Sequence, residues 1–166
     1  MLFALVVLPM PARALELSSG VSLGGVQAGT VPRLAVSPNM GILWRMNDGL
    51  TLAIHDLLNI LPPISKSGFG AYNHTSAALG YAWANGYLDI GPSFSIYSMM
   101  ACGIRLCGRV TGLSPGGQIQ ASLYFTGLLG ASVSVNVDWV GGSSLILPGG
   151  VAAMIVAGPV FRWGIK

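Results

Sequence analysis

The sequence predicts an all-β fold, an eight-stranded antiparallel up-and-down transmembrane β-barrel. Three observations lead to this prediction: apolar and polar residues alternate along eight segments, tight and long connections alternate between them, and only 8% of the residues are charged. An average soluble domain carries about 25% charged residues. Because hydrophobic residues make up 52% of the chain, we expect most of the outer surface to face an apolar medium.

The alternation is clearest in residues 129–140, LGASVSVNVDWV. The odd positions are apolar and end in Trp139, whereas the even positions are small or polar and include Asn136 and Asp138. Successive side chains of a β-strand point to opposite faces. This segment is therefore a strand with one complete apolar face and one small, polar face.

Seven further segments share this pattern, and the full set is residues 17–27, 33–46, 50–61, 74–84, 87–100, 118–126, 129–140 and 151–163. Short turns are expected at residues 47–49 (Asn-Asp-Gly), 85–86 (Asn-Gly) and 126–127, because Asn, Asp and Gly tolerate positive φ. Longer loops are expected at residues 62–73, 101–117 and 141–150. An even number of alternating segments of about ten residues, with tight turns at one end, is typical of an outer-membrane barrel.

The charged residues indicate which face points inward. Most of the charges within the segments lie on the small, polar face: Arg33, Arg45, Asp89, Asp138 and Arg162. A membrane barrel turns its apolar face to lipid and its polar face to the lumen. Asp56 is an exception on the apolar face, where we expect either a β-bulge or a position above the membrane.

Outward aromatic residues lie near the ends of the segments that run toward the periplasm. They are Trp44, Tyr81, Trp83, Phe125, Phe161 and Trp163. Aromatic residues gather at the membrane interfaces of such barrels, so these six predict a periplasmic girdle. Trp139 ends a segment of the opposite direction and is expected at the other interface.

Three prolines in the segments, Pro38, Pro92 and Pro159, fall on the outward face. Proline cannot donate to a β-ladder, so we expect bulges at these positions. A helical membrane protein is the rival fold, since residues 110–137 and 139–161 carry no charge. Their period of two and their Gly, Pro and Asn content favour strands instead.

The end of the chain, residues 158–163 (GPVFRW), resembles the G-x-x-aromatic-x-aromatic signal by which assembly machinery recognises last strands. It differs in that Gly164, Ile165 and Lys166 follow the last aromatic residue. In its architecture, over the whole mature chain, the sequence resembles the small eight-stranded outer-membrane β-barrels of Gram-negative bacteria. The resemblance implies an outer-membrane location, contact with outer-membrane lipid, and recognition by barrel-assembly machinery.

The start of the chain predicts export from the cytoplasm. Residues 1–14 have the composition of a signal peptide, with an apolar run at residues 2–8 and a small-x-small pattern at residues 12–14. The barrel would then occupy residues 15–166, and an apolar first strand is the alternative. In an exported chain, Cys102 and Cys107 are expected to form a disulfide, with free thiols or metal ligands as alternatives.

His74 and Ser76 form the one catalytic-looking pair, and they share a face of their segment. They faintly resemble the pair of the outer-membrane lipid A deacylases, but Ala77 and Ala78 follow where that family has Asn-Ala. A serine nucleophile also needs a base oriented by an acid. The shared face points inward, where a bulky lipid cannot reach, so we expect no enzymatic activity. A lipid-modifying hydrolase is the alternative.

The inward charges near the periplasmic end predict a network of Glu16, Arg45, Asp89 and Arg162. Glu16 should lie between Arg45 and Arg162, at the seam where the first and last strands close the barrel, with Asp89 as the second acid across the lumen. An uncompensated buried charge costs about 3–5 kcal/mol. Because an eight-stranded barrel is filled by its side chains, a plugged polar interior is expected, with a narrow channel as the alternative.

The loops on the cell-surface side are basic, with Lys66, Arg105 and Arg109 and no acid. Such side chains form charge-assisted pairs with phosphates, which makes lipopolysaccharide a candidate partner. No cluster has metal-ligand spacing, so no cofactor is expected. The net charge of +3 is scattered and does not indicate nucleic-acid binding. The sequence therefore predicts an outer-membrane barrel of structural or surface-interaction type.

Overall fold

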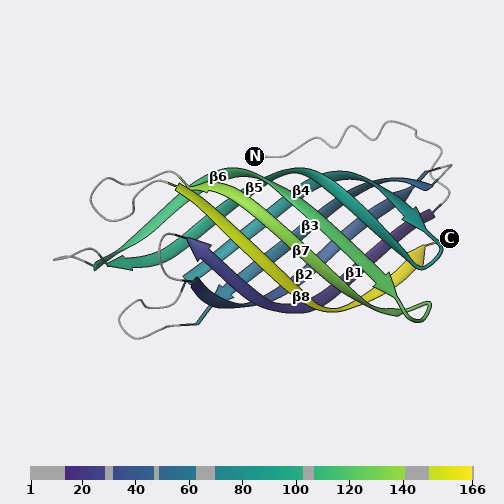
Figure 1. Ribbon diagram of the computed structural model, residues 1–166, viewed down its shortest axis with the longest axis horizontal. Coiled ribbons are helices and arrows are strands. Elements are labelled where there is room, and N and C mark those ends of the chain that lie inside the picture. Colours follow the sequence, from purple (N-terminus) through teal and green to yellow (C-terminus); the bar gives the residue numbers. More distant parts are fainter. Residues whose placement is uncertain are drawn as a thin grey trace.

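The computed structural model is a closed barrel of eight antiparallel strands in chain order, in which β1 pairs with both β2 and β8 (Figure 1). The strands are β1 (Ala14–Ala28), β2 (Pro32–Arg45), β3 (Leu50–Leu61), β4 (Gly70–Trp83), β5 (Gly86–Cys102), β6 (Cys107–Tyr124), β7 (Leu129–Val140) and β8 (Gly150–Ile165). The structure describes residues 14–28, 32–46, 49–62, 70–102, 107–140 and 150–165. The predicted fold class is confirmed.

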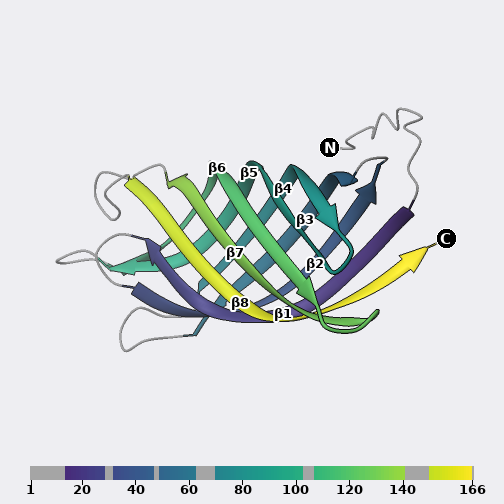
Figure 2. The same cartoon turned by 45° about the vertical axis from the view of Figure 1, so that its right-hand side comes forward.

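The strands cross the barrel at a steep tilt, as the two views of Figures 1 and 2 show. β1 begins and β8 ends at the same end of the barrel, which we call the terminal end; the β2–β3, β4–β5 and β6–β7 connections also lie there. The opposite end is called the loop end. None of the described residues belongs to a helix long and apolar enough to cross a membrane.

The predicted loop at residues 101–117 is wrong. β5 continues to Cys102 and β6 already begins at Cys107, and their residues pair without interruption, including Pro115 opposite Phe94. Glycine and proline at residues 112 and 115–117 weaken the local strand signal, but the long partner β5 supplies the ladder. For the same reason β4 begins at Gly70, inside the predicted loop at residues 62–73.

The three outward prolines lie in regular strands, so the predicted bulges are wrong. On both sides of Pro38, for example, the same register holds, with Val36 opposite Ile60 and Asn39 opposite Leu57. Between these pairs the β2–β3 ladder is interrupted at Ser37 and Pro38, and proline has no N–H to donate. Each proline still pairs on its other side, as Pro38 does with Val21. The barrel therefore loses local hydrogen bonds there and keeps its register.

The polarity of the two faces is inverted relative to a soluble protein. Outward apolar side chains are exposed, such as Leu23 at 64%, Leu34 at 75% and Ile90 at 63%, whereas the inward Asn59 and Asn136 are fully buried. Asp56 pairs with Thr75 in an uninterrupted β3–β4 ladder, so no bulge turns it inward. The predicted inward and outward faces are confirmed.

Two apolar clusters pack inside the barrel among the polar side chains. The cluster toward the loop end contains Val26, Ala35, Leu57, Leu61, Met154 and Val156. The cluster toward the terminal end contains Leu43, Ala53, Ala82, Tyr87, Tyr124 and Val160. Both clusters contain residues from strands that are far apart in the sequence. The lumen is therefore a packed core in which the polar side chains occupy defined places.

Candidate functional site

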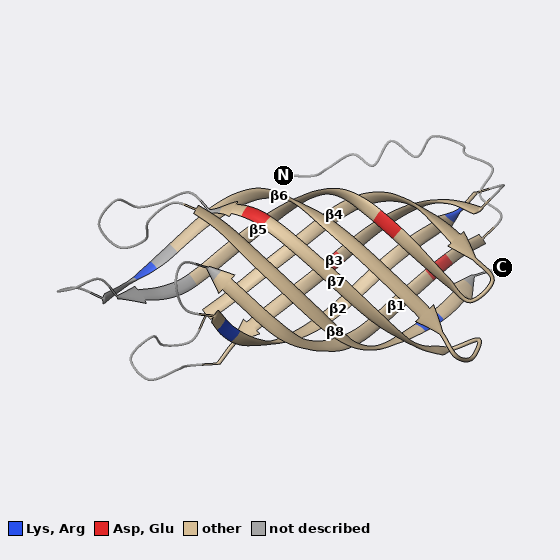
Figure 3. Cartoon of the chain, viewed as in Figure 1, with Lys and Arg blue, Asp and Glu red and all other residues tan. Residues whose placement is uncertain are grey.

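The chemistry of the chain is concentrated in the lumen, where three groups of charged side chains follow the barrel axis. Acidic and basic residues gather at the end that holds the C-terminus, and further acidic residues lie along the barrel (Figure 3). Period-two alternation places these side chains inward, and the closure of the sheet brings them together from different strands.

The first group lies at the terminal end, around the carboxylate of Glu16 on β1. Arg45 of β2 approaches one carboxylate oxygen at 3.1 Å, and Arg162 of β8 approaches the other at 3.7 Å. The guanidinium of Arg162 also lies 4.0 Å from the centre of the Tyr124 ring, which is a cation–π arrangement. Glu16 therefore links both neighbours of β1 at the seam of the barrel.

The second group is a buried pair of His55 on β3 and Asp89 on β5, with Nε2 of the histidine 2.8 Å from a carboxylate oxygen. Asp89, predicted as the second acid of the Glu16 network, thus takes a different partner. The His55 ring lies parallel to the ring of Tyr87, with centroids 6.0 Å apart, and Gln120 donates to the Tyr87 hydroxyl at 2.8 Å. These contacts fix the imidazole from two sides.

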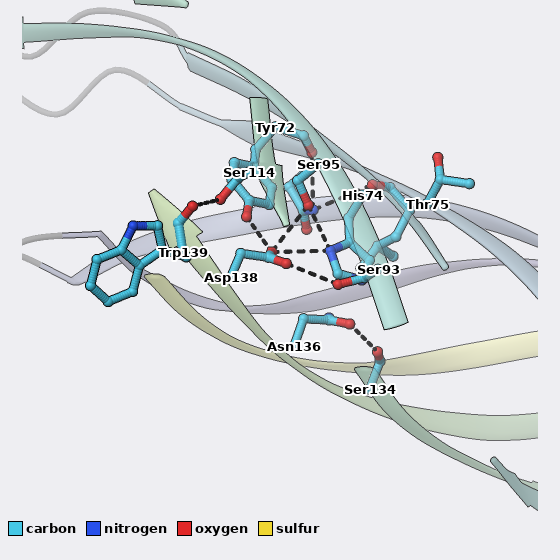
Figure 4. A network of polar contacts seen from close by, with 12 residues as sticks. Tyr72, His74, Thr75, Ser93, Ser95, Ser114, Ser134, Asn136, Asp138 and Trp139 are labelled. Carbon is cyan, nitrogen blue, oxygen red and sulfur yellow. Dashed lines mark hydrogen bonds and ion pairs between the residues drawn. The ribbon is translucent and has the colours of Figure 1, made fainter. Parts of the chain in front are cut away.

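The third group centres on Asp138 of β7, toward the loop end (Figure 4). Its carboxylate accepts hydrogen bonds from the hydroxyls of Tyr72, Ser93 and Ser95, and Nδ1 of His74 lies 3.1 Å away. All five side chains are buried, His74 completely. A carboxylate without water needs several donors, and here strands β4 and β5 supply them.

Some buried polar atoms of the lumen have no partner among the described residues. They include Nε2 of His74, Oγ of Ser76, one carboxylate oxygen of Asp89, Oε1 of Gln118 and Nδ2 of Asn136. Buried polar groups in a native protein commonly bind ordered water. The cavity beside His55 has a volume of only about 10 Å³, roughly the space of one water centre. The lumen is thus polar and filled.

His74 and Ser76, the weak catalytic candidates of the sequence, are not hydrogen-bonded to each other among the described residues. His74 and Ser76 are both buried and share the inward face, but Oγ of Ser76 has no hydrogen-bond partner among the residues that the structure describes. In a serine triad the nucleophile and the acid bind opposite nitrogens of the histidine. Here Ser95 and Asp138 both approach Nδ1 of His74, so these three residues do not have the arrangement of a triad.

The six aromatic residues of the predicted girdle lie near the terminal end. Five are exposed, from Trp83 at 40% to Phe125 at 73%, whereas Trp44 is half-buried. The rings of Phe161 and Trp163 are stacked with centroids 6.3 Å apart. Trp139 is 61% exposed and is the residue before Val140, which ends β7 at the loop end. The outer face is thus bounded by aromatic side chains.

Several predicted features fall outside the described residues. These are the signal peptide apart from Ala14, the basic residues Lys66 and Arg105, and the side chains of Cys102 and Cys107. The backbones of the two cysteines are direct partners in the β5–β6 ladder. Arg109 is exposed on β6.

Sequence reasoning missed the third group and the partner of Asp89. The alternation already placed His55, Ser93, Ser95 and Asp138 on the inward face, whereas Tyr72 fell in the predicted loop at residues 62–73. The missing information was the register, which decides whether residues on different strands lie at the same height. The register also places β4 and β7 on separate parts of the wall, so that His74 and Asp138 meet across the lumen.

These observations define a class of protein, the small eight-stranded barrel with an apolar outer face and a filled polar lumen. Solved structures of outer-membrane proteins share this fold. Neisserial surface protein A matches with a TM-score of 0.59 and 12% identity, over 90% of this chain and 97% of that chain. The N-terminal β-barrel domain of Pseudomonas aeruginosa OprF matches with a TM-score of 0.56 and 12% identity, over 92% and 98%.

Ail, the attachment invasion locus protein of Yersinia pestis, also matches, with a TM-score of 0.56 and 9% identity over 90% of this chain and 98% of that chain. No protein-family model matches the sequence, and no curated protein matches it. At these identities the likeness concerns the fold, and the fold is that of the small outer-membrane barrels.

Proposed function

We propose that this chain is an integral outer-membrane β-barrel of a Gram-negative bacterium, with a structural or surface-interaction role and no catalytic one. The observation that carries the proposal is the inverted polarity of the two faces. Leu23, Leu34 and Ile90 point outward and are exposed, while Asn59, Asp89 and Asn136 are buried in the lumen. The outer-membrane proteins that share the fold support the same placement.

The energetics of the outer face support a membrane location. Burying a Leu or Ile side chain is worth about 1.5–3 kcal/mol relative to leaving it in water. Every strand exposes such side chains or aromatic rings, and soluble monomers rarely expose apolar patches larger than a few hundred Å². In a bilayer the same surface contacts acyl chains at no such cost.

The test is expression with an export signal followed by membrane fractionation. We expect the folded chain in the outer-membrane fraction, with faster gel migration when unheated than when boiled and a β-rich far-UV circular dichroism spectrum in detergent. A helical spectrum, or recovery as a soluble protein, would contradict the proposal.

The hydrolase alternative has a direct assay. Lipid A is analysed by mass spectrometry after expression of the wild-type chain and of the Ser76→Ala variant. We expect unmodified lipid A from both, because Ser76 is buried and has no hydrogen-bond partner among the described residues. Loss of an acyl chain with the wild type alone would establish the hydrolase.

The surface role is assigned to the basic residues of the cell-surface side, Lys66, Arg105 and Arg109. Phosphate groups of lipopolysaccharide are the proposed ligands, because guanidinium groups pair well with phosphate oxygens. Ail has been solved in complex with the heparin analogue sucrose octasulfate, so one barrel of this fold binds a polyanion. We expect Arg105→Ala with Arg109→Ala to weaken lipopolysaccharide binding, and unchanged binding would refute the contact.

A disulfide between Cys102 and Cys107 would rigidify this basic hairpin. Direct partners in an antiparallel ladder have Cα atoms about 4.5–5.5 Å apart, which lies within the range of disulfides, and the two cysteines are such partners. Mass spectrometry of the non-reduced chain should show the bond in exported protein. Detection of two free thiols would refute the disulfide.

A further inference from the structure

The outer face of β3 and β4 carries a cluster of polar side chains, Asp56, Asn73 and Thr75. Nδ2 of Asn73 donates to Oδ1 of Asp56 at 3.1 Å, and the hydroxyl of Thr75 donates to the same oxygen at 2.7 Å. Thr75 is exposed, and the other two are half-buried. We call these three residues the outer polar cluster.

The outer polar cluster lies midway along the apolar band. Its outward neighbours along β3 are Ile54 and Leu58, and across the sheet Asp56 pairs with Met40 on one side. Asp56 is six residues beyond Leu50, the first residue of β3, and each residue rises about 2.5 Å along the axis of a tilted barrel. The cluster is therefore about 15 Å above the terminal end of a band that is ~25 Å tall.

A carboxylate at this depth requires a partner if, as proposed above, the band faces lipid. Ionisable side chains within a membrane are rare and mark functional sites. Acyl chains offer no hydrogen-bond donor, and lipid headgroups lie at the two interfaces, away from the middle of the band. Asp56 is also the one charged side chain on the outer face between the girdle and Trp139, among the residues that the structure describes.

The outer polar cluster keeps both a free acceptor and a free donor. Among the described residues no hydrogen bond reaches Oδ2 of Asp56, because both donors bind Oδ1. An asparagine amide carries two N–H groups, and Asn73 uses one of them on Asp56. A patch that presents a donor and an acceptor side by side is complementary to its own copy across a two-fold axis.

We propose that two copies of this chain dimerise through the outer faces of β3 and β4. The second N–H of Asn73 in each copy donates to Oδ2 of Asp56 in the other, which makes two symmetric hydrogen bonds shielded from lipid. Each Asn73 amide then lies between the two carboxylates and donates one N–H to each. The proposal rests on the membrane placement given above.

The surroundings of the outer polar cluster suit close contact between two barrels. Along β4 the cluster is flanked by Ala71 and Ala77, which share its outward parity. Small residues let backbones approach closely within a membrane, where packing and hydrogen bonds drive association. Larger apolar side chains, including Leu79 at 63% exposure and Phe94 at 47%, border the patch and would complete the interface.

The experiment measures energy transfer between donor- and acceptor-labelled copies of the full chain in phosphatidylcholine vesicles, over a range of protein-to-lipid ratios. We expect a dimer for the wild type. Asp56→Leu and Asn73→Leu should each raise the apparent dissociation constant about tenfold, since both symmetric bonds are lost. Asp56→Asn keeps an acceptor oxygen and should retain most of the association.

A matched pair of Ala→Leu variants distinguishes an effect specific to the β3–β4 face from a general effect of added side-chain volume. Ala77→Leu adds volume beside the outer polar cluster and should weaken the dimer, whereas Ala157→Leu adds the same volume to the exposed outer face of β8, across the barrel. Ala157→Leu should therefore leave the energy transfer unchanged. Equal effects of the two substitutions would overturn the assignment of the interface.

Heat-dependent gel migration of every variant shows whether the barrel is folded and inserted. A wild-type barrel that is inserted but monomeric at all ratios would overturn the dimer and leave the proposed function intact. Unchanged energy transfer in Asp56→Leu would overturn the role of the outer polar cluster. A chain that does not insert would instead refute the membrane placement.

Discussion

The carboxylates inside the barrel are satisfied in different ways, and each way predicts a different response to mutation. Glu16 lies between two arginines, and Asp89 pairs with a histidine. Asp138 accepts hydrogen bonds from hydroxyl groups and lies beside His74. In a lumen with little room for water, removing one partner leaves the others with unmet hydrogen bonds, which costs more than the net value of the bond itself.

Glu16→Ala should lower the free energy of unfolding by about 2 kcal/mol, because it leaves Arg45 and Arg162 as like charges without an acid between them. Combining it with Arg162→Met removes one stranded charge, so the double variant should lose less than Glu16→Ala alone. Urea titrations followed by tryptophan fluorescence measure both. If a double-mutant cycle shows no coupling, the seam is held by backbone pairing alone.

Asp138→Ala should be more damaging than Glu16→Ala and should lower the free energy of unfolding by about 3 kcal/mol or more. Three hydroxyls and His74 then lose a common buried acceptor. Asp138→Asn keeps one acceptor oxygen and should cost less. The same urea titration applies. Asn136→Ala is the matched control on β7, since its buried Nδ2 has no partner among the described residues and its Oδ1 accepts a single hydrogen bond, from Ser134. A control loss as large as that of Asp138→Ala would refute the central role of the carboxylate.

At the scale of single elements, the turn between β2 and β3 shows how local sequence sets geometry. Residues 47–49 were predicted as a turn because Asn, Asp and Gly tolerate positive φ. Gly49 has a φ of 83°, and a Cβ added there would lie 2.6 Å from the ring of Tyr81. The positive φ and the nearby ring of Tyr81 therefore both require glycine at this position.

Gly49→Ala should reduce the free energy of unfolding by about 1–2 kcal/mol, from the left-handed conformation and the contact with Tyr81 together. Gly127→Ala, in the β6–β7 turn, is the control, because a Cβ there meets no atom within 4 Å. It should change stability by less than about 0.5 kcal/mol. Chemical denaturation compares the two, and equal losses would mean that the strain at Gly49 is relieved elsewhere.

The prolines and β6 show where element prediction was incomplete. The expectation of bulges assumed that a missing N–H must distort a strand, but at Pro38 the partners on either side stay in register. The glycines and Pro115 of β6 weakened its period-two pattern, whereas the long ladder with β5 holds these residues in a strand. In both cases the deciding interactions came from the neighbouring strand.

For the whole molecule, the filled lumen predicts that the barrel does not conduct. Tyr72 and Tyr87 are buried across it, and the cavity beside His55 holds about 10 Å³. We expect no stable open current from the purified chain in planar bilayers at neutral pH. The unheated, folded band on a gel serves as the control for insertion-competent protein, and discrete conductance steps from such a sample would favour the narrow channel.

The sequence by itself determined the class of this protein. Alternation with a period of two, a low charge content and turn residues at the right spacing were enough to predict eight strands, their direction and which face is outward, because each of these depends on nearest neighbours along the chain. β3 and β7 have the bounds that the alternation predicted. The parity of Glu16, Asp89 and Asp138 followed from the same pattern.

Only the tertiary structure decided which inward side chains meet. Closure and register bring His55 to Asp89 and His74 to Asp138, pairs separated by 34 and 64 residues. The same register puts Asn73 and Thr75 beside Asp56 on the outer face. A one-residue shift between strands would exchange the two faces, and the height at which residues of different strands meet is a property of the closed sheet, which no local pattern records.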